Sequence, residues 1–132
     1  MLRVAINGMG RIGRAAFKII LENPELELVA VNDLVPAENI AYLMNYDTVY
    51  GRYDKNVEGS TGTLTVDGKE YKMFDEKDPA QLPWDELDVD TVFECTGVFT
   101  KREDLSKHIK AGAKRVILSA PAKSEDITTV VH

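Results

Sequence analysis

Apolar and polar positions follow a strand–helix–strand pattern along the first third of the chain. Residues 2–7 and 26–32 are short, almost continuous apolar runs, which are typical of parallel strands buried on both faces. Between them, residues 10–22 repeat apolar side chains with helical spacing, and Pro24 prevents this helix from continuing. The apolar face that the spacing predicts consists of Ile12, Ala15, Ala16, Ile19 and Ile20.

The middle of the chain predicts a second helix and a hairpin. Pro36 is expected at the first helical position, which proline favours, and the helix should extend to about residue 46. Its predicted buried side consists of Ile40, Leu43, Met44 and Tyr46. Residues 61–74 form two alternating runs around Asp67-Gly68, which is a strong signal for a β-hairpin.

The last third of the chain returns to strands and a helix. Residues 75–88 are expected to be loop, with one helical turn beginning at Trp84, a packing anchor. A capping box formed by Thr100 and Glu103 should begin a helix that Gly112 ends. The inner side of this helix is predicted to consist of Leu105, Ile109 and Gly112. Further strands are expected at residues 91–95, 116–119 and 127–131.

A glycine motif lies between the first strand and the first helix. Residues 8–13 read Gly-Met-Gly-Arg-Ile-Gly, and Asp33 ends the second strand twenty residues after Gly13. Strand, glycine turn, helix, strand and acid in this order form a dinucleotide-binding fingerprint. Gly8 permits a tight turn, Gly10 lets a pyrophosphate approach the backbone, and Gly13 lets the helix pack closely on the sheet. The alternatives are that the glycines only make a flexible turn and that Asp33 is only a turn residue.

The chemistry of the motif indicates a particular ligand. The first N–H groups of the helix, near Arg11 and Ile12, lack intrahelical partners and carry the positive end of the helix dipole, which suits a pyrophosphate. Asp33 can accept hydrogen bonds from a ribose diol, whereas a 2′-phosphate would meet its negative charge. We therefore predict NAD as the cofactor, in preference to NADP.

The alternation of strands and helices predicts an α/β fold. We expect a Rossmann-type, doubly wound, mostly parallel sheet with an inserted β-hairpin. In such sheets ligands bind at the carboxyl ends of the strands, near the point where the strand order reverses. Those ends are predicted at Asn7-Gly8, Asn32-Asp33, Thr96-Gly97 and Ser119-Ala120.

Length, charge and cysteine content restrict the class of protein. The 132 residues predict a single domain over residues 1–132. The net charge of −6, from 22 acidic and 16 basic residues without a basic cluster, argues against nucleic acid as a partner. No apolar run is long enough to cross a bilayer, and the first residues do not resemble a signal peptide. With one cysteine, a reducing compartment is expected, and the cytoplasm is the predicted location.

Cys95 is the only thiol in the sequence, and it is expected to be a core residue. It lies in an apolar strand between Phe93 and Val98, with Glu94 beside it. Apolar burial and an acidic neighbour both disfavour the thiolate that a nucleophile needs. Neither His108 nor His132 forms a recognisable dyad with Cys95, and no spacing indicates a metal site.

Several segments in order resemble one enzyme family. The chain resembles the N-terminal, NAD-binding part of phosphorylating glyceraldehyde-3-phosphate dehydrogenase. The resemblance covers essentially the whole chain, and the order and spacing of its segments are specific. These segments are residues 7–14, 32–34, 45–48, 94–99, 108–113 and 119–123.

The resemblance implies positions for the adenosine end of the cofactor. The backbone of Arg11 and Ile12 would meet the pyrophosphate, and Asp33 would hold the adenosine ribose. Leu34 looks like the NAD-preferring form of the family, and Lys77 occupies the position near the adenine. Without the family, Lys77 would be an ordinary solvated lysine.

The resemblance also implies positions along the rest of the cofactor. Thr96, Gly97 and Phe99 would border the cofactor path, and Ser119 would lie toward the nicotinamide. Without the family, Thr96 and Ser119 would only satisfy backbone groups at strand ends, and Phe99 would be a core residue.

The family oxidises glyceraldehyde 3-phosphate in glycolysis through a thioester on a cysteine, with hydride transfer to NAD. The resemblance places that cysteine in a Ser-Cys-Thr-Thr-Asn motif, which this sequence does not contain. We therefore expect the catalytic domain to be absent from this chain, which would bind NAD without turnover. The alternatives are a free-standing nucleotide-binding or interaction module and the cofactor half of an erythrose-4-phosphate dehydrogenase. A cofactor half without its catalytic domain is also expected to associate with itself through exposed apolar surface.

Overall fold

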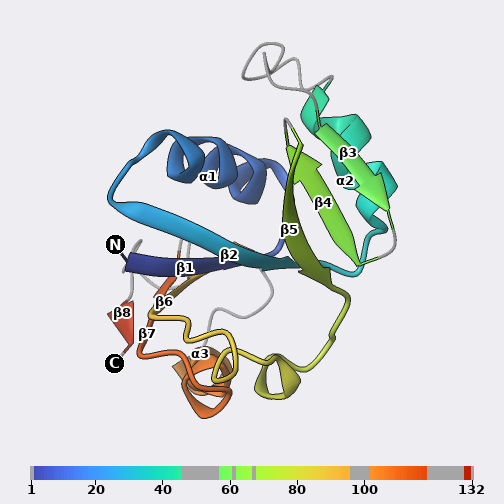
Figure 1. Ribbon diagram of the computed structural model, residues 1–132. Coiled ribbons are helices and arrows are strands. Elements are labelled where there is room, and N and C mark those ends of the chain that lie inside the picture. Colours follow the sequence, from blue (N-terminus) through green and yellow to red (C-terminus); the bar gives the residue numbers. More distant parts are fainter. Residues whose placement is uncertain are drawn as a thin grey trace.

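A computed structural model describes residues 2–45, 57–60, 62–66, 68–95, 102–118 and 130–131 (Figure 1). The helices are α1 (Arg11–Glu22), α2 (Ala37–Asn45) and α3 (Arg102–Lys110), with a 3-10 turn η1 (Pro79–Gln81). The strands are β1 (Leu2–Asn7), β2 (Leu26–Asn32), β3 (Val57–Ser60), β4 (Thr63–Val66), β5 (Lys69–Phe74), β6 (Thr91–Glu94), β7 (Arg115–Leu118) and β8 (Val130–Val131).

The strands in this part of the chain form one mixed sheet in the order β3-β4-β5-β2-β1-β6-β7-β8. The central strands, from β5 through β2, β1 and β6 to β7, are parallel. The pairs β3–β4, β4–β5 and β7–β8 are antiparallel. The predicted α/β fold, a doubly wound and mostly parallel sheet with an inserted β-hairpin, is therefore confirmed.

Helices cover both faces of the sheet. Figure 1 shows α1 on one face and α3 on the opposite face, while α2 lies against β3 and β4. The larger apolar cluster, on the α1 side, includes Val4, Ile6, Phe17, Ile20, Val31 and Met44. The smaller cluster, on the α3 side, includes Ala5, Ala30, Leu82, Trp84, Val89 and Val92.

The buried face of α1 differs from the prediction. Phe17 and Ile20 are buried in the larger cluster, whereas the side chain of Ile19 is 66% exposed. The predicted face was therefore wrong at Ile19 and omitted Phe17. Gly13, Phe17 and Ile20 share a face because they are four and three residues apart, and the apolar neighbours Ile19 and Ile20 cannot both point inward.

Helix α2 begins one residue later than predicted. The carbonyl of Pro36 accepts the N–H groups of Asn39 and Ile40, so Pro36 precedes the first helical residue. Ile40 and Met44 are buried as expected, but Leu43 is 39% exposed, which corrects its predicted place in the core. The small residues Ala37 and Ala41 complete the buried side instead. Tyr46 lies outside the described residues.

The predicted hairpin and the end of the last predicted helix agree with the structure, while Thr100 and most of the predicted strand 127–131 lie outside the described residues. The hairpin over β4 and β5 is antiparallel, with Thr63 opposite Lys72 and Val66 opposite Lys69. Strand β3 was not predicted, because its Val-Glu-Gly-Ser sequence has no alternating pattern and pairs only with β4 at the edge. Helix α3 ends as expected before Gly112, whose N–H donates to the carbonyl of Ile109.

The pairing of β1 with β2 contains one register shift. Val4 lies opposite Leu28, but Ala5 lies opposite Ala30, so β2 has one extra residue, Val29, at this point. The shift brings Asn32, at the end of β2, directly opposite Asn7, at the end of β1. The carboxyl ends of the two strands therefore match residue for residue.

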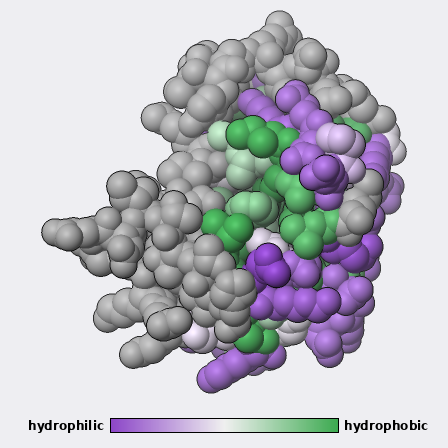
Figure 2. Space-filling view, turned by 90° about the vertical axis from the view of Figure 1, so that its left-hand side faces the viewer, coloured by the Kyte–Doolittle hydropathy of each residue, from purple (hydrophilic) through white to green (hydrophobic). Residues whose placement is uncertain are grey.

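The surface next to the start of β1 is mixed in character. Figure 2 shows hydrophobic residues gathered on the described part of this side, with hydrophilic residues around them. Over the described surface as a whole, and not on this side alone, the exposed large hydrophobic side chains are Leu2, Ile19, Leu34, Val35, Tyr42 and Leu43. In the described ranges, no helix is long and apolar enough to cross a membrane.

Candidate functional site at the carboxyl ends of β1 and β2

The glycine loop (residues 8–10) turns the chain from β1 into α1. Gly8 has a φ of 98°, a conformation that side chains with a Cβ rarely adopt, and its N–H donates to the carbonyl of Asn32 over 2.7 Å. A Cβ on Gly13 would overlap the carbonyl oxygen of Gly8. Only glycine at position 13 therefore allows the first turn of α1 to lie directly on this loop.

Gly10 leaves open space at the beginning of α1. A Cβ built on Gly10 would meet nothing within 4 Å, and Gly10 caps α1 without a side-chain hydrogen bond. The carbonyl of Gly10 accepts the N–H of Arg14, so the N–H groups of Arg11, Ile12 and Gly13 precede the first bond of this kind. The loop and the helix end therefore form a cradle with free backbone N–H groups and the positive end of the helix dipole, which suits an anionic group.

Asp33 connects the end of β2 to the glycine loop. Its Oδ2 accepts the backbone N–H of Met9 over 2.6 Å, and its Oδ1 accepts the N–H of Val35 over 2.9 Å. Since a carboxylate has about four lone-pair sites, these two bonds orient the group and leave it able to accept from a ligand diol. The half-buried Asp33 therefore lies beside the cradle in a defined orientation.

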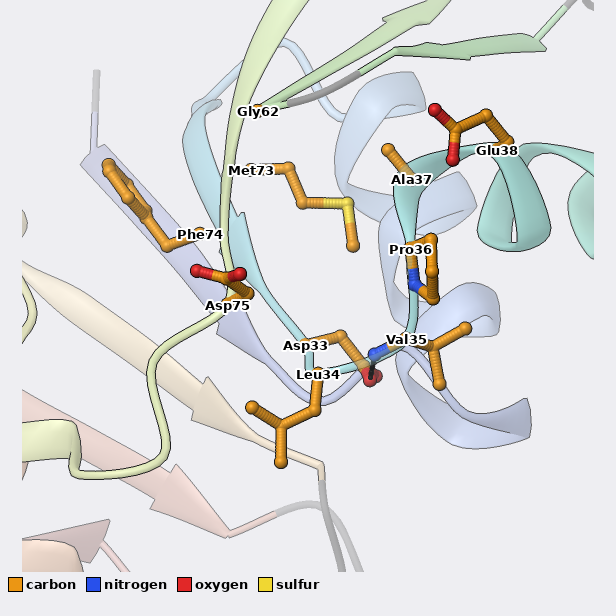
Figure 3. A pocket seen from close by; sticks show the side chains of 10 residues that line it. All are labelled: Asp33, Leu34, Val35, Pro36, Ala37, Glu38, Gly62, Met73, Phe74 and Asp75. Carbon is orange, nitrogen blue, oxygen red and sulfur yellow. Dashed lines mark hydrogen bonds between the residues drawn. The ribbon is translucent and has the colours of Figure 1, made fainter.

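A cavity of about 270 Å³ borders Asp33 on the α2 side (Figure 3). Its lining comes from the β2–α2 connection and the end of β5, and it includes the carboxylates of Asp33, Glu38 and Asp75. In Figure 3 the Met73 side chain points toward Pro36 and Ala37. An acidic lining of this kind disfavours a phosphate group and tolerates a hydroxyl.

Lys77 lies close in sequence to the same strand ends. The side chain of Asn32 accepts the N–H of Glu76 over 2.9 Å and donates to the carbonyl of Glu76 over 3.0 Å. The backbone next to Lys77 is therefore held beside the end of β2, and the Lys77 side chain is exposed. The structure thus brings Gly8, Gly10 and Gly13 to Asp33, with Lys77 at the margin.

The remaining predicted residues, Thr96, Gly97, Phe99 and Ser119, lie outside the described residues. Their described neighbours can be placed. The N–H of Cys95 donates to the carbonyl of Asn7 over 2.7 Å, so β6 ends beside the glycine loop. Cys95 itself is 6% exposed, which confirms that it is a core residue.

Sequence reasoning missed a row of buried polar side chains beneath the loop. Asn32, Asn7 and Glu94 end β2, β1 and β6, and each is at most 3% exposed. His108 and Trp84, which were treated as a helix residue and a packing anchor, join this row by hydrogen bonds. One pattern in the sequence could have indicated this row: three apolar strands each end on a residue with an amide or carboxylate side chain.

The comparisons with known proteins agree with this geometry. A family model described as the NAD binding domain of glyceraldehyde 3-phosphate dehydrogenase matches residues 2–102. The chain belongs to this family. The match includes the glycine loop, Asp33 and Lys77, while Ser119 lies beyond it.

Individual relatives support the assignment along the whole chain. A glyceraldehyde-3-phosphate dehydrogenase of Thermotoga maritima is 53% identical over 99% of this chain and 40% of the relative. The enzyme of Geobacillus stearothermophilus is 55% identical over 98% of this chain and 39% of the relative. The chain thus spans about two fifths of the length of the curated relatives that it matches. Because the chain belongs to an NAD-binding domain family, the prediction of NAD as its cofactor is confirmed.

Proposed function

We propose that this chain binds NAD in the cradle formed by the glycine loop, the beginning of α1 and Asp33. The hydrogen bond between the Met9 N–H and the Asp33 carboxylate carries the proposal, because it joins the pyrophosphate-binding element to the ribose-binding element. The open space at Gly10 and the close approach at Gly13 support the fit of a dinucleotide.

The residues would share the binding as follows. The backbone of Arg11 and Ile12 would hold the pyrophosphate, Asp33 the adenosine ribose, and Lys77 would lie near the adenine. The carboxylates of Glu38 and Asp75, which line the cavity next to Asp33, add to the preference for a ribose diol over a 2′-phosphate. Thr96, Gly97 and Phe99 are proposed to border the cofactor, with Ser119 toward the nicotinamide.

We propose further that residues 1–132 form one NAD-binding domain of an aldehyde-oxidising dehydrogenase. The parent reaction would be the oxidation and phosphorylation of glyceraldehyde 3-phosphate, for which bound NAD supplies the hydride acceptor. The names of the relatives support this substrate over erythrose 4-phosphate. The sequence contains no Ser-Cys-Thr-Thr-Asn motif, and its one thiol is buried, so this chain is proposed to bind NAD without turnover.

Titration of the protein with NAD, ADP-ribose and nicotinamide mononucleotide tests the site. Ligand that binds only the folded state raises the free energy of unfolding, by about 2.7 kcal/mol at a hundredfold excess over Kd. NAD and ADP-ribose should both stabilise the protein, because they carry the pyrophosphate and the adenosine ribose. Nicotinamide mononucleotide should have little effect. Stabilisation by nicotinamide mononucleotide alone, or by none of the three at millimolar concentration, would contradict the proposal.

A further inference from the structure

The face of the sheet under α3 changes from apolar to polar at the ends of three neighbouring strands. Asn7 lies opposite Asn32 on one side and opposite Glu94 on the other, and we call these three residues the polar row. Two residues earlier on the same face lie Ala5, Ala30 and Val92, all with 0% exposure. The polar row is equally inaccessible, with exposures of 2% for Asn7, 3% for Asn32 and 0% for Glu94.

Hydrogen bonds run along the polar row in one direction. The Asn32 side-chain amide donates to Oδ1 of Asn7 over 2.7 Å. The Asn7 amide donates in turn to Oε1 of Glu94 over 2.6 Å. The Asn7 amide is engaged through both oxygen and nitrogen within the row, while the Asn32 oxygen accepts the backbone N–H of Glu76, so the orientations of both amide groups are determined.

Hydrogen bonds connect the row to His108, which is in α3, and to Trp84, which is in the smaller apolar cluster. The Trp84 Nε1–H, which can only donate, lies 3.0 Å from Nδ1 of His108, so this nitrogen must accept. The ring proton therefore belongs on Nε2, which donates to Oε1 of Glu94 over 2.8 Å. His108 and Trp84 are both fully buried, and their rings are stacked with centroids 6.3 Å apart. The hydrogen-bond pattern thus assigns one tautomer to His108.

Two members of the polar row directly precede part of the proposed site. Asn7 is followed by the glycine loop, and Asn32 is followed by Asp33. The backbones are also joined, because Gly8 donates to the carbonyl of Asn32 and Cys95 donates to the carbonyl of Asn7, each over 2.7 Å. Asn7 and Asn32 are therefore each one residue away from the part of the site that they would position.

A buried polar row costs folding free energy that an apolar row would not. A carboxylate and two amides in an enclosed layer lose their hydration, and similar apolar side chains often pack with equal or greater stability. Violations of this local rule concentrate at functional sites. Packing alone therefore does not account for the row, whereas a need for fixed orientation at the strand ends does.

We propose that the hydrogen-bonded chain Trp84–His108–Glu94–Asn7–Asn32 positions the glycine loop relative to Asp33 before the cofactor binds. This inference rests on the NAD site proposed above, and it assigns Glu94 and His108 as positioning residues that do not themselves touch the cofactor. Preorganisation of this kind raises affinity because binding need not order the loop.

Three variants at or near Glu94 test the role. Glu94→Leu removes the acceptor of Asn7 and His108, whereas Glu94→Gln keeps an oxygen that can accept both N–H groups. Val92→Ala is the matched control, since Val92 is on the same strand and the same face but in the apolar row. We expect Glu94→Leu to raise the Kd for NAD about tenfold or more through lost preorganisation, and the other two to change it by less than about threefold.

A second readout needs no cofactor. Amide hydrogen exchange at Gly8 and Met9 should become faster in Glu94→Leu than in Val92→Ala, after correction for global stability. Emission from Trp84, the only tryptophan, should change in Glu94→Leu and stay near that of the parent protein in Glu94→Gln. If Glu94→Leu does not fold, Asn7→Ala replaces it, because it breaks the same chain without removing a carboxylate.

The outcomes separate the two proposals. Parent protein that binds NAD, with equal losses of affinity in Glu94→Leu and Val92→Ala and equal exchange at the loop, would overturn the positioning role and leave the NAD site in place. Parent protein that does not bind NAD would overturn the proposed function. In that case faster exchange at Gly8 and Met9 in Glu94→Leu alone would still support positioning of the loop, and unchanged exchange would overturn it.

Discussion

The backbone N–H of Met9 donates a 2.6 Å hydrogen bond to Oδ2 of Asp33, which joins the glycine loop to the end of β2. The same carboxylate accepts the N–H of Val35 through Oδ1. One side chain therefore holds two backbone segments. This double role makes Asp33 sensitive to a change that keeps its shape and removes its charge.

Asp33→Asn should narrow the preference for NAD over NADP. The variant removes the negative charge that disfavours a 2′-phosphate, and its amide group can replace only one of the two accepting oxygens. The ratio of the two Kd values, measured by calorimetry at one ionic strength, should fall about tenfold or more if one charge repulsion of about 1.4 kcal/mol is lost. An unchanged ratio would remove Asp33 from the ribose-binding role.

Two glycine substitutions should separate an effect on stability from an effect on binding. Gly13→Ala should destabilise the fold by about 1–3 kcal/mol, because its Cβ would overlap the carbonyl of Gly8. Gly10→Ala should cost at most about 1 kcal/mol, as alanine is a poorer helix cap, but it should weaken NAD binding by filling the cradle. Urea unfolding and NAD titration of both variants check this pair. Unimpaired NAD binding by Gly10→Ala would place the pyrophosphate elsewhere.

The corrected buried face of α1 makes a prediction about stability. Phe17→Ala should lower the free energy of unfolding by about 3–5 kcal/mol, because Phe17 is fully buried. Ile19→Ala on the same helix should change it by less than about 0.5 kcal/mol, since Ile19 is 66% exposed. Equal losses in urea unfolding would show that the helix packs with a different face.

Tyr71 should contribute to loss of stability at alkaline pH. Burial raises the pKa of Tyr71 above its ordinary value of 10.0, and the ring lies edge-on to Phe17. Above about pH 10 the unfolded state therefore binds fewer protons than the folded state, so the free energy of unfolding falls as pH rises. Tyr71→Phe should reduce this fall. Urea unfolding at about pH 9 and pH 11 compares the variant with the parent protein.

Strong local signals made most of the fold predictable. The apolar runs of β1 and β2, the Asp-Gly turn between β4 and β5 and the glycine at the end of α3 each follow from the residues themselves. Strand β3 and the inward face of α1 do not, because they depend on what packs against them. Ile19 and Ile20 are equally apolar, and only the sheet below decides that Ile20 is buried.

The candidate site was predictable in those parts that consist of backbone groups and of residues close together in sequence. The glycine spacing and Asp33 indicate the cradle directly. The polar row was not predictable in the same way, because Asn7, Glu94 and His108 are far apart in sequence and meet only through strand order and helix placement. Glu94 beside Cys95 was treated as a modifier of the thiol, but its side chain points to the opposite face, toward His108.

The register shift at Val29 sets a limit on simplifying this protein. A redesign could remove the register shift while keeping the length of β2. The Asn32 side chain would then point to the other face of the sheet, and its amide would enter the apolar layer under α1. The extra residue thus decides which face of the sheet Asn32 points to. Any engineered version of the sheet has to retain an extra residue before the end of β2 or exchange the side chains that follow it.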